Sequence, residues 1–100
     1  MKFMIQSTPV NQESWPKDLL ARFQACKTVV QEGLADGTTE CAYMVVGSNK
    51  SVSIVDAPSH ELLWQALAIY PMAPFLAFEV TPLVDMDFFF DRVIASYQAG

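Results

Sequence analysis

Asp56, Ser59 and His60 lie within five positions of one another, and His60 is the only histidine of the chain. These are the residue types of a hydrolytic triad, in which a histidine base takes the serine proton and a carboxylate orients the histidine. Ser59 and His60 are adjacent, however, and adjacent side chains at a helix start do not face each other. Ser59 follows Pro58 without a G-x-S-x-G motif, so a helix N-cap explains it better than a nucleophile does. His60 remains a candidate for contacting a ligand or a second subunit.

Four other side chains are candidates for chemistry on a small molecule. Lys27 could bind a carboxylate or an enolate oxygen, or could simply be solvated. Glu79 falls inside a predicted central strand, where burial raises the pKa of a carboxyl group and suits it to act as a base; its alternative role is a paired interface group. Tyr43 could donate its phenol proton to an oxyanion or pack as a sheet aromatic. Cys26 lies on an apolar helical stripe and is best explained as a small core residue, with a nucleophile or a ligand contact as the alternative.

Composition narrows the class of protein. The net charge of −5 and the scattered six basic residues argue against nucleic-acid binding, which needs clustered Lys and Arg. No apolar run approaches the ~18 residues of a membrane span, and the N-terminus is not typical of a signal peptide. Cys26 and Cys41 lack zinc-type spacing, and no glycine-rich phosphate loop is present, so we expect no metal and no cofactor. The expected protein is soluble, cytoplasmic and acidic.

Hydrophobic periodicity and turn residues predict one domain, residues 1–100, with alternating strands and helices. The first helix is expected to begin at Ser14 and to end between Gly33 and Gly37. The predicted order is strand, helix, strand, strand, helix, strand and a terminal helix, over residues 2–7, 14–37, 40–46, 51–57, 58–70, 75–84 and 85–97. This is the α+β, ferredoxin-like β-α-β-β-α-β arrangement, a four-stranded antiparallel sheet plus a C-terminal helix.

The predicted sheet has one face covered by both helices and one face bare. An antiparallel sheet that faces water alternates apolar and polar residues, but residues 41–46 and 75–80 are apolar at almost every position. The chain is also poor in charged residues, which make up 17% against the ~25% that is typical. We therefore expect a second copy to cover the bare face, giving a homodimer. One of Phe88, Phe89 and Phe90 is expected to cover a partner subunit as well.

The block Gly37 to Leu83, GTTECAYMVVGSNKSVSIVDAPSHELLWQALAIYPMAPFLAFEVTPL, resembles muconolactone delta-isomerase and its relatives in the dimeric α/β-barrel superfamily. The glycine-led strand, the VDAPS turn and the closing EVTPL carry the resemblance. It implies a homodimer whose two sheets enclose a pocket, with larger rings in some members. It also implies proton transfer on an unsaturated lactone without metal or cofactor. A Glu-Lys pair is expected on the first helix of such an isomerase; here Cys26 and Lys27 align with it, so the lysine matches and the carboxylate does not.

The leading hypothesis is a small-molecule pocket protein, acting as a cofactor-free isomerase on a small lactone or unsaturated carbonyl compound. Lys27 would bind an anion, and Glu79 or Tyr43 would move the proton. One alternative is a non-catalytic ligand-binding or assembly protein of the same fold. A further alternative is a cofactor-free monooxygenase. No nucleic acid or membrane partner is expected, and the dimer could build a higher oligomer.

Overall fold

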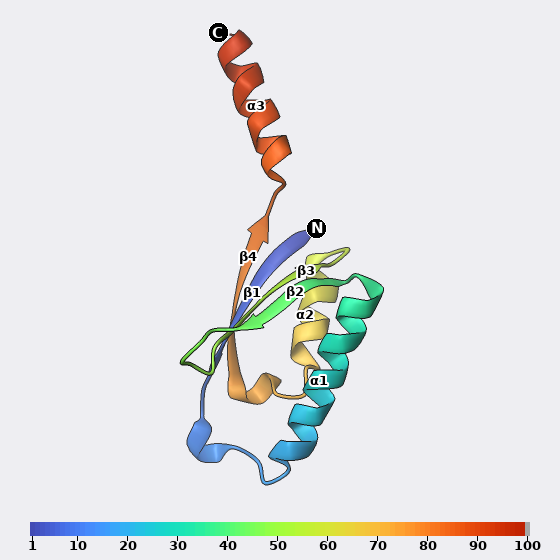
Figure 1. Ribbon diagram of the computed structural model, residues 1–100, viewed down its shortest axis with the longest axis vertical. Coiled ribbons are helices and arrows are strands. Elements are labelled where there is room, and N and C mark those ends of the chain that lie inside the picture. The colour runs from blue at the N-terminus through green and yellow to red at the C-terminus, as the bar shows by residue number, and fades with distance from the viewer. Residues whose placement is uncertain (100) are drawn as a thin grey trace.

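A computed structural model describes residues 1–99 of the chain, and Figure 1 shows their arrangement. The predicted order of elements is confirmed. In chain order they are β1 (Lys2–Pro9), η1 (Gln12–Ser14), α1 (Leu19–Asp36), β2 (Thr39–Met44), β3 (Ser51–Asp56), α2 (His60–Ala68), η2 (Ala73–Phe75), β4 (Leu76–Leu83) and α3 (Met86–Ala99).

The four strands form one antiparallel sheet in the order β2-β3-β1-β4, as the ferredoxin-like prediction requires. The first strand of the chain is therefore central, and Ser7 pairs with Ser51 on one side and with Phe78 on the other. Directly paired residues of antiparallel strands lie on the same face of the sheet. This register fixes which side chains share a face.

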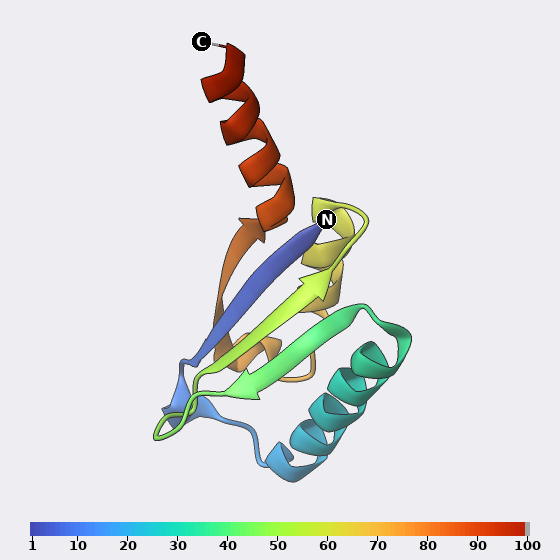
Figure 2. The same ribbon diagram turned by 45° about the horizontal axis from the view of Figure 1, so that its top comes forward.

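One face of the sheet, which we call the helix face, carries the buried side chains of Phe3, Ile5 and Ser7 and is covered by α1 and α2 (Figure 2). The core forms where this face meets α2, from Phe3, Ile5, Ala57 and Leu63. The opposite face, which we call the bare face, carries the residues that alternate with these along the strands, among them Gln6, Val52, Ile54 and Glu79. The sheet thus has one covered side and one uncovered side within the protomer.

The start of the first helix differs from the prediction. Ser14 is not an N-cap: it ends a short 3₁₀ turn, and α1 begins at Leu19. Trp15 is extended (φ −62°, ψ 141°), because a residue before proline is pushed out of the helical region and Pro16 follows it. The Trp15 indole Nε1 donates to the carbonyl of Val10 at 3.1 Å, which holds this segment in place.

The other helix ends follow the sequence signals. Ser59 caps α2, its side-chain oxygen accepting a hydrogen bond from the backbone N–H of Leu62 at 3.2 Å. Gly37 follows α1 with φ +85°, a left-handed conformation that glycine adopts without strain.

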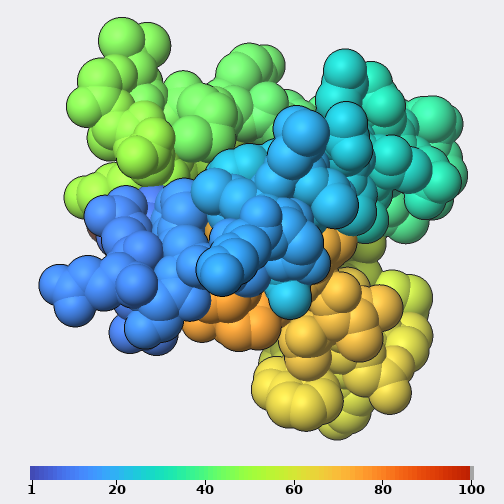
Figure 3. All heavy atoms as spheres, turned by 90° about the horizontal axis from the view of Figure 1, so that it is seen from below, coloured from blue at the N-terminus to red at the C-terminus, as the bar shows by residue number. Residues whose placement is uncertain are grey.

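Figure 3, seen from the end opposite α3, shows the segment before α1 (blue) between the β2–β3 turn (green) and the α2–β4 connection (orange). There the backbone N–H of Val10 donates to the carbonyl of Phe75 at 2.9 Å.

The terminal helix α3 projects away from the sheet, and the molecule is elongated, 62 × 27 × 25 Å (Figure 1). Its large apolar side chains are largely exposed, among them Met86, Phe88, Phe89, Phe90, Ile94 and Tyr97. The rest of the protomer, over residues 1–99, therefore leaves the apolar side chains of this helix largely uncovered. None of the helices in residues 1–99 has the length and hydropathy needed to cross a bilayer.

Candidate functional site

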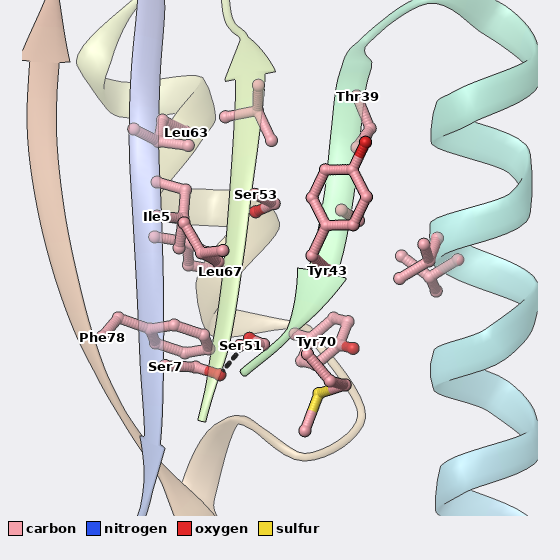
Figure 4. Close-up of a pocket in the computed structure, with 16 residues that line it drawn as sticks. Ile5, Ser7, Thr39, Tyr43, Ser51, Ser53, Leu63, Leu67, Tyr70 and Phe78 are labelled. Carbon is pink, nitrogen blue, oxygen red and sulfur yellow. Dashed lines mark hydrogen bonds between the residues drawn. The ribbon is translucent and has the colours of Figure 1, made fainter. Parts of the chain in front are cut away.

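A cavity of about 360 Å³ lies between the sheet and the two helices of the protomer (Figure 4). The resemblance led us to expect a pocket between the sheets of two subunits, whereas this cavity lies between the sheet and the helices of the same chain and is partly open to solvent. Its volume falls in the range of small-molecule sites, ~300–1,000 Å³. Sixteen residues line it: Ile5, Ser7, Val29, Val30, Thr39, Ala42, Tyr43, Met44, Ser51, Val52, Ser53, Val55, Leu63, Leu67, Tyr70 and Phe78.

The sheet supplies hydroxyl groups to one wall of the cavity. The register places Ser7 of β1 opposite Ser51 of β3, and Ser53 lies two residues further along the same face. Ser7 is only 6% exposed, and its hydroxyl forms a hydrogen bond with that of Ser51, drawn as the dashed line in Figure 4. Burying a hydroxyl costs free energy unless it is hydrogen-bonded. The pairing of the two serines satisfies Ser7 and keeps the wall polar.

The helices supply the apolar wall. Val29 and Val30 come from α1, and Leu63 and Leu67 come from α2, one turn apart on the face that meets the sheet. The sheet side of the cavity therefore mixes hydroxyl groups with apolar side chains such as Ile5 and Phe78, and the helix side is apolar apart from Tyr70.

Gly33 of α1 allows this helix to approach β2 closely. It is buried, and a Cβ atom built on it would lie 2.4 Å from Oγ1 and 3.2 Å from Cβ of Thr39. Any side chain at position 33 would push against Thr39, which itself lines the cavity. Gly33 is buried, whereas the next residue, Leu34, is 46% exposed.

Tyr70 lies just after α2 and extends its phenol into the cavity lining. Its ring packs edge-to-face on Phe78, with the ring centroids 6.4 Å apart. Burial raises the pKa of the Tyr70 phenol far above its ordinary value, and the neighbouring Cys26 thiol adds to this rise. Tyr70 therefore stays neutral at physiological pH and can donate a hydrogen bond to a ligand oxygen.

The structure brings some of the residues predicted from the sequence to the cavity and leaves others away from it. Tyr43 contributes to the cavity lining from the edge strand β2, but it pairs with Val52, so its largely exposed side chain lies on the bare face. Cys26 is buried beside Tyr70, in agreement with its interpretation as a core residue. Lys27 is exposed on α1 and Glu79 pairs with Gln6 on the bare face; neither is in the lining.

The Asp56, Ser59 and His60 group forms no triad. The Ser59 hydroxyl caps α2, and the Asp56 carboxylate accepts a hydrogen bond from the Met1 ammonium group at 2.9 Å. The His60 ring packs edge-to-face on Phe3, with the ring centroids 5.5 Å apart, and it lies outside the cavity lining. Each of the three residues thus has a structural contact of its own, and only the Ser59 cap is signalled by the local sequence.

Ser7, Ser51, Ser53 and Tyr70 were not among the candidates chosen from the sequence. The signal was present in the spacing of Ser51 and Ser53, because residues two apart in a strand share a face. Which face they share depends on strand pairing, which spacing does not give. Within residues 1–99 no group of three or more His, Cys, Asp or Glu side chains is placed to hold a metal ion.

The sequence and the fold of this chain are similar to those of known proteins. The family model of muconolactone delta-isomerase matches residues 1–87. A solved structure of muconolactone isomerase superposes with a TM-score of 0.75 at 24% identity, covering 85% of this chain and 90% of that one. The 5-chloro-2-hydroxyhydroquinone dehydrochlorinase of Burkholderia phenoliruptrix AC1100, solved with 2,5-dihydroxybenzoquinone, superposes with a TM-score of 0.62 at 15% identity, covering 88% and 98%. At these identities the two structures show a shared fold. No curated protein matches the sequence.

Proposed function

Because the chain belongs to the muconolactone delta-isomerase family, we propose that its cavity binds a small oxygenated ring compound and moves a proton on it, as a cofactor-free isomerase. The observation that carries this proposal is the cavity itself, in which hydroxyl groups face an apolar wall. Small-molecule sites are typically apolar with a few convergent polar groups. The cavity of about 360 Å³ has room for a single ring with a short substituent.

The proposed reaction moves a carbon–carbon double bond relative to a carbonyl group. A base removes a proton from a carbon conjugated with the carbonyl, and the electron pair of that bond passes to the carbonyl oxygen as an enolate. The proton then returns to a different carbon, so no atom or electron is gained or lost overall. Donors aimed at the enolate oxygen lower the barrier, and removing one such donor typically costs ~10²–10³-fold in rate. Neutral Tyr70 is the proposed donor.

The candidates Tyr43, Lys27 and Glu79 remain part of the proposal as groups that bind an anion or move the proton. Tyr43 already contributes to the cavity lining. Lys27 and Glu79 lie outside the lining of one protomer, and Glu79 is on the opposite face of the sheet, so we assign them to contacts between subunits and not to the cavity of their own protomer. Cys26 acts in this scheme only as a neighbour of Tyr70, and His60 as a contact at the edge of the core.

Self-association is the second part of the proposal. The apolar side chains of α3 are exposed in the protomer, and Val52 and Ile54 lie on the bare face. Exposed apolar surface of this kind marks sites of association. We propose a homodimer, able to build a larger ring, in the cytoplasm, where the free thiols Cys26 and Cys41 would stay reduced.

A non-catalytic ligand-binding protein is the second candidate function, and one observation favours it. Within residues 1–99, the cavity lining includes no carboxylate, histidine or lysine that could act as a base. A protein that binds a ring without turning it over would have this lining. The two candidates differ in a single measurable property, which is proton exchange on the bound compound.

The test uses two butenolides, muconolactone and β-angelica lactone, incubated with the full-length protein in deuterated buffer. Proton NMR should show protein-dependent exchange and double-bond migration in at least one of them. Tyr70→Phe should lower that rate by about tenfold or more while leaving thermal stability near wild type. Ser48→Ala, in the β2–β3 turn, is the matched control and should keep the wild-type rate. Saturable binding without exchange would favour the non-catalytic candidate, and absence of both would refute the cavity proposal.

A further inference from the structure

The polar groups of the cavity are all hydroxyls. Among the described residues, the lining contains no Asp, Glu, Lys, Arg or His. Its polar side chains on the helix side of the sheet are Ser7, Thr39, Ser51, Ser53 and Tyr70, while Tyr43 is directed to the bare face. Hydroxyls both donate and accept hydrogen bonds, so they suit carbonyl and hydroxyl groups of a ligand. They cannot neutralise a full negative charge.

The half-buried cation of α1, Arg22, is already engaged in hydrogen bonds. It lies one turn before Cys26, and its Nε donates to the Asp18 carboxylate at 3.1 Å and its Nη1 to the carbonyl of Pro71 at 2.8 Å. Lys27 points to solvent on the same helix. Since the chain as a whole carries a net charge of −5, its long-range field repels anions as well. Within one protomer, a carboxylate entering the cavity would give up part of its hydration without gaining a partner of opposite charge.

The sheet wall has hydrogen-bonding capacity to spare for a ligand. Ser7 and Ser51 satisfy each other, whereas the Ser53 hydroxyl forms no hydrogen bond with another described residue. Figure 4 shows Ser53 between the Ser7–Ser51 pair and Thr39. A valine in place of Ser53 would pack against the helices at lower desolvation cost. The serine is therefore better explained by a polar ligand than by packing.

We propose that this cavity selects an uncharged ring compound carrying two or more carbonyl or hydroxyl oxygens, such as a neutral lactone or a quinone, and disfavours its carboxylate analogue. The inference rests on the proposed function, because it names the class of compound that the same cavity takes. Ser53 and Tyr70 then bind separate oxygens of the ring, and Leu63 and Leu67 pack on its face.

The test is a pair of compounds of equal size and different charge, muconolactone and its primary amide. Isothermal titration calorimetry with the wild-type protein at neutral pH should show the amide binding at least about tenfold more tightly than the acid, since the acid loses solvation of a full charge. Ser53→Ala should weaken amide binding by about three- to tenfold, as expected for one neutral hydrogen bond. Ser48→Ala is again the matched control and should leave the affinity unchanged.

The outcomes separate this inference from the proposed function. If the acid binds as tightly as the amide or more tightly, the charge selectivity is refuted, while the cavity keeps its proposed role. If the amide is preferred but Ser53→Ala binds it as well as wild type does, the assignment of the serine wall is refuted. If neither compound binds and neither exchanges a proton, the proposed function fails together with the inference.

Discussion

Gly33→Ala tests how closely α1 must approach β2 for the cavity to form. The new Cβ would lie 2.4 Å from Oγ1 of Thr39 and 3.2 Å from its Cβ, so the helix or the strand has to move. Overpacking of this kind costs about 1–3 kcal/mol, and alanine offsets about 0.5–1 kcal/mol of it through its better helix propensity. Taking the middle of both ranges, we expect a net loss of about 1 kcal/mol in the free energy of unfolding. For a chain of this length, each kcal/mol lowers Tm by about 4–8 °C.

Urea denaturation followed by circular dichroism, at one fixed protein concentration, measures this loss. Adding Thr39→Ala to Gly33→Ala removes the Oγ1 atom and should restore part of the lost stability. Gly47→Ala is the matched control: nothing lies within 4 Å of its added Cβ, and its cost comes from its φ of +82° alone. Its effect should therefore add to that of Thr39→Ala without rescue. A Gly33→Ala protein as stable as wild type would refute the close-packing argument.

Three further outcomes can be measured with the same protein. Ser59→Ala removes the α2 cap and should cost about 0.5–2 kcal/mol in thermal unfolding without changing ligand affinity; an affinity loss at unchanged stability would point to a role in the site. The Thr38 hydroxyl donates a hydrogen bond that lowers the pKa of Asp36, and the Thr38 backbone N–H adds a smaller effect in the same direction. The stabilisation from these bonds is therefore present above the ordinary pKa of 3.8 and is lost as the pH falls below it. Asp36→Asn should hence differ from wild type in urea midpoint at neutral pH and converge with it as the pH falls below the lowered pKa of Asp36, and a constant difference would contradict the assignment. Phe89→Asp in α3 should lower the mass of the assembled protein measured by light scattering. An unchanged mass would show that the α3 face is not part of the assembly.

The strands and α2 could be predicted because their signals are local. Ser59 lies between a proline and an apolar run, and Pro71 follows the end of the helix, so both limits of α2 are visible in a short window. The start of α1 was missed for an equally local reason. Ser14 is a residue type that commonly caps helices. Trp15, however, precedes Pro16 and is therefore extended, so α1 begins only at Leu19.

The cavity could not be predicted because it depends on register. In β3 the apolar residues Val52 and Ile54 alternate with Ser51 and Ser53, which would suggest that the valine and isoleucine face the core. Pairing with β1 places the serines on the helix face and the apolar pair on the bare face. A shift of one residue in pairing would exchange the two sets. Tyr70 escaped notice for a related reason, since its burial beside Cys26 comes from packing between two helices distant in sequence.

The central position of β1 has a consequence for how the protein folds and for how its ligand can be found. Ser7 meets its partners only when residues near positions 51 and 78 have both joined the first strand, and such distant contacts are formed late and slowly in folding. A partly folded chain therefore has no cavity, and a true ligand binds the native state alone. Ligand binding of this kind raises the unfolding temperature in proportion to the logarithm of ligand concentration. Thermal-shift screening of ring compounds should consequently report occupancy of the cavity directly.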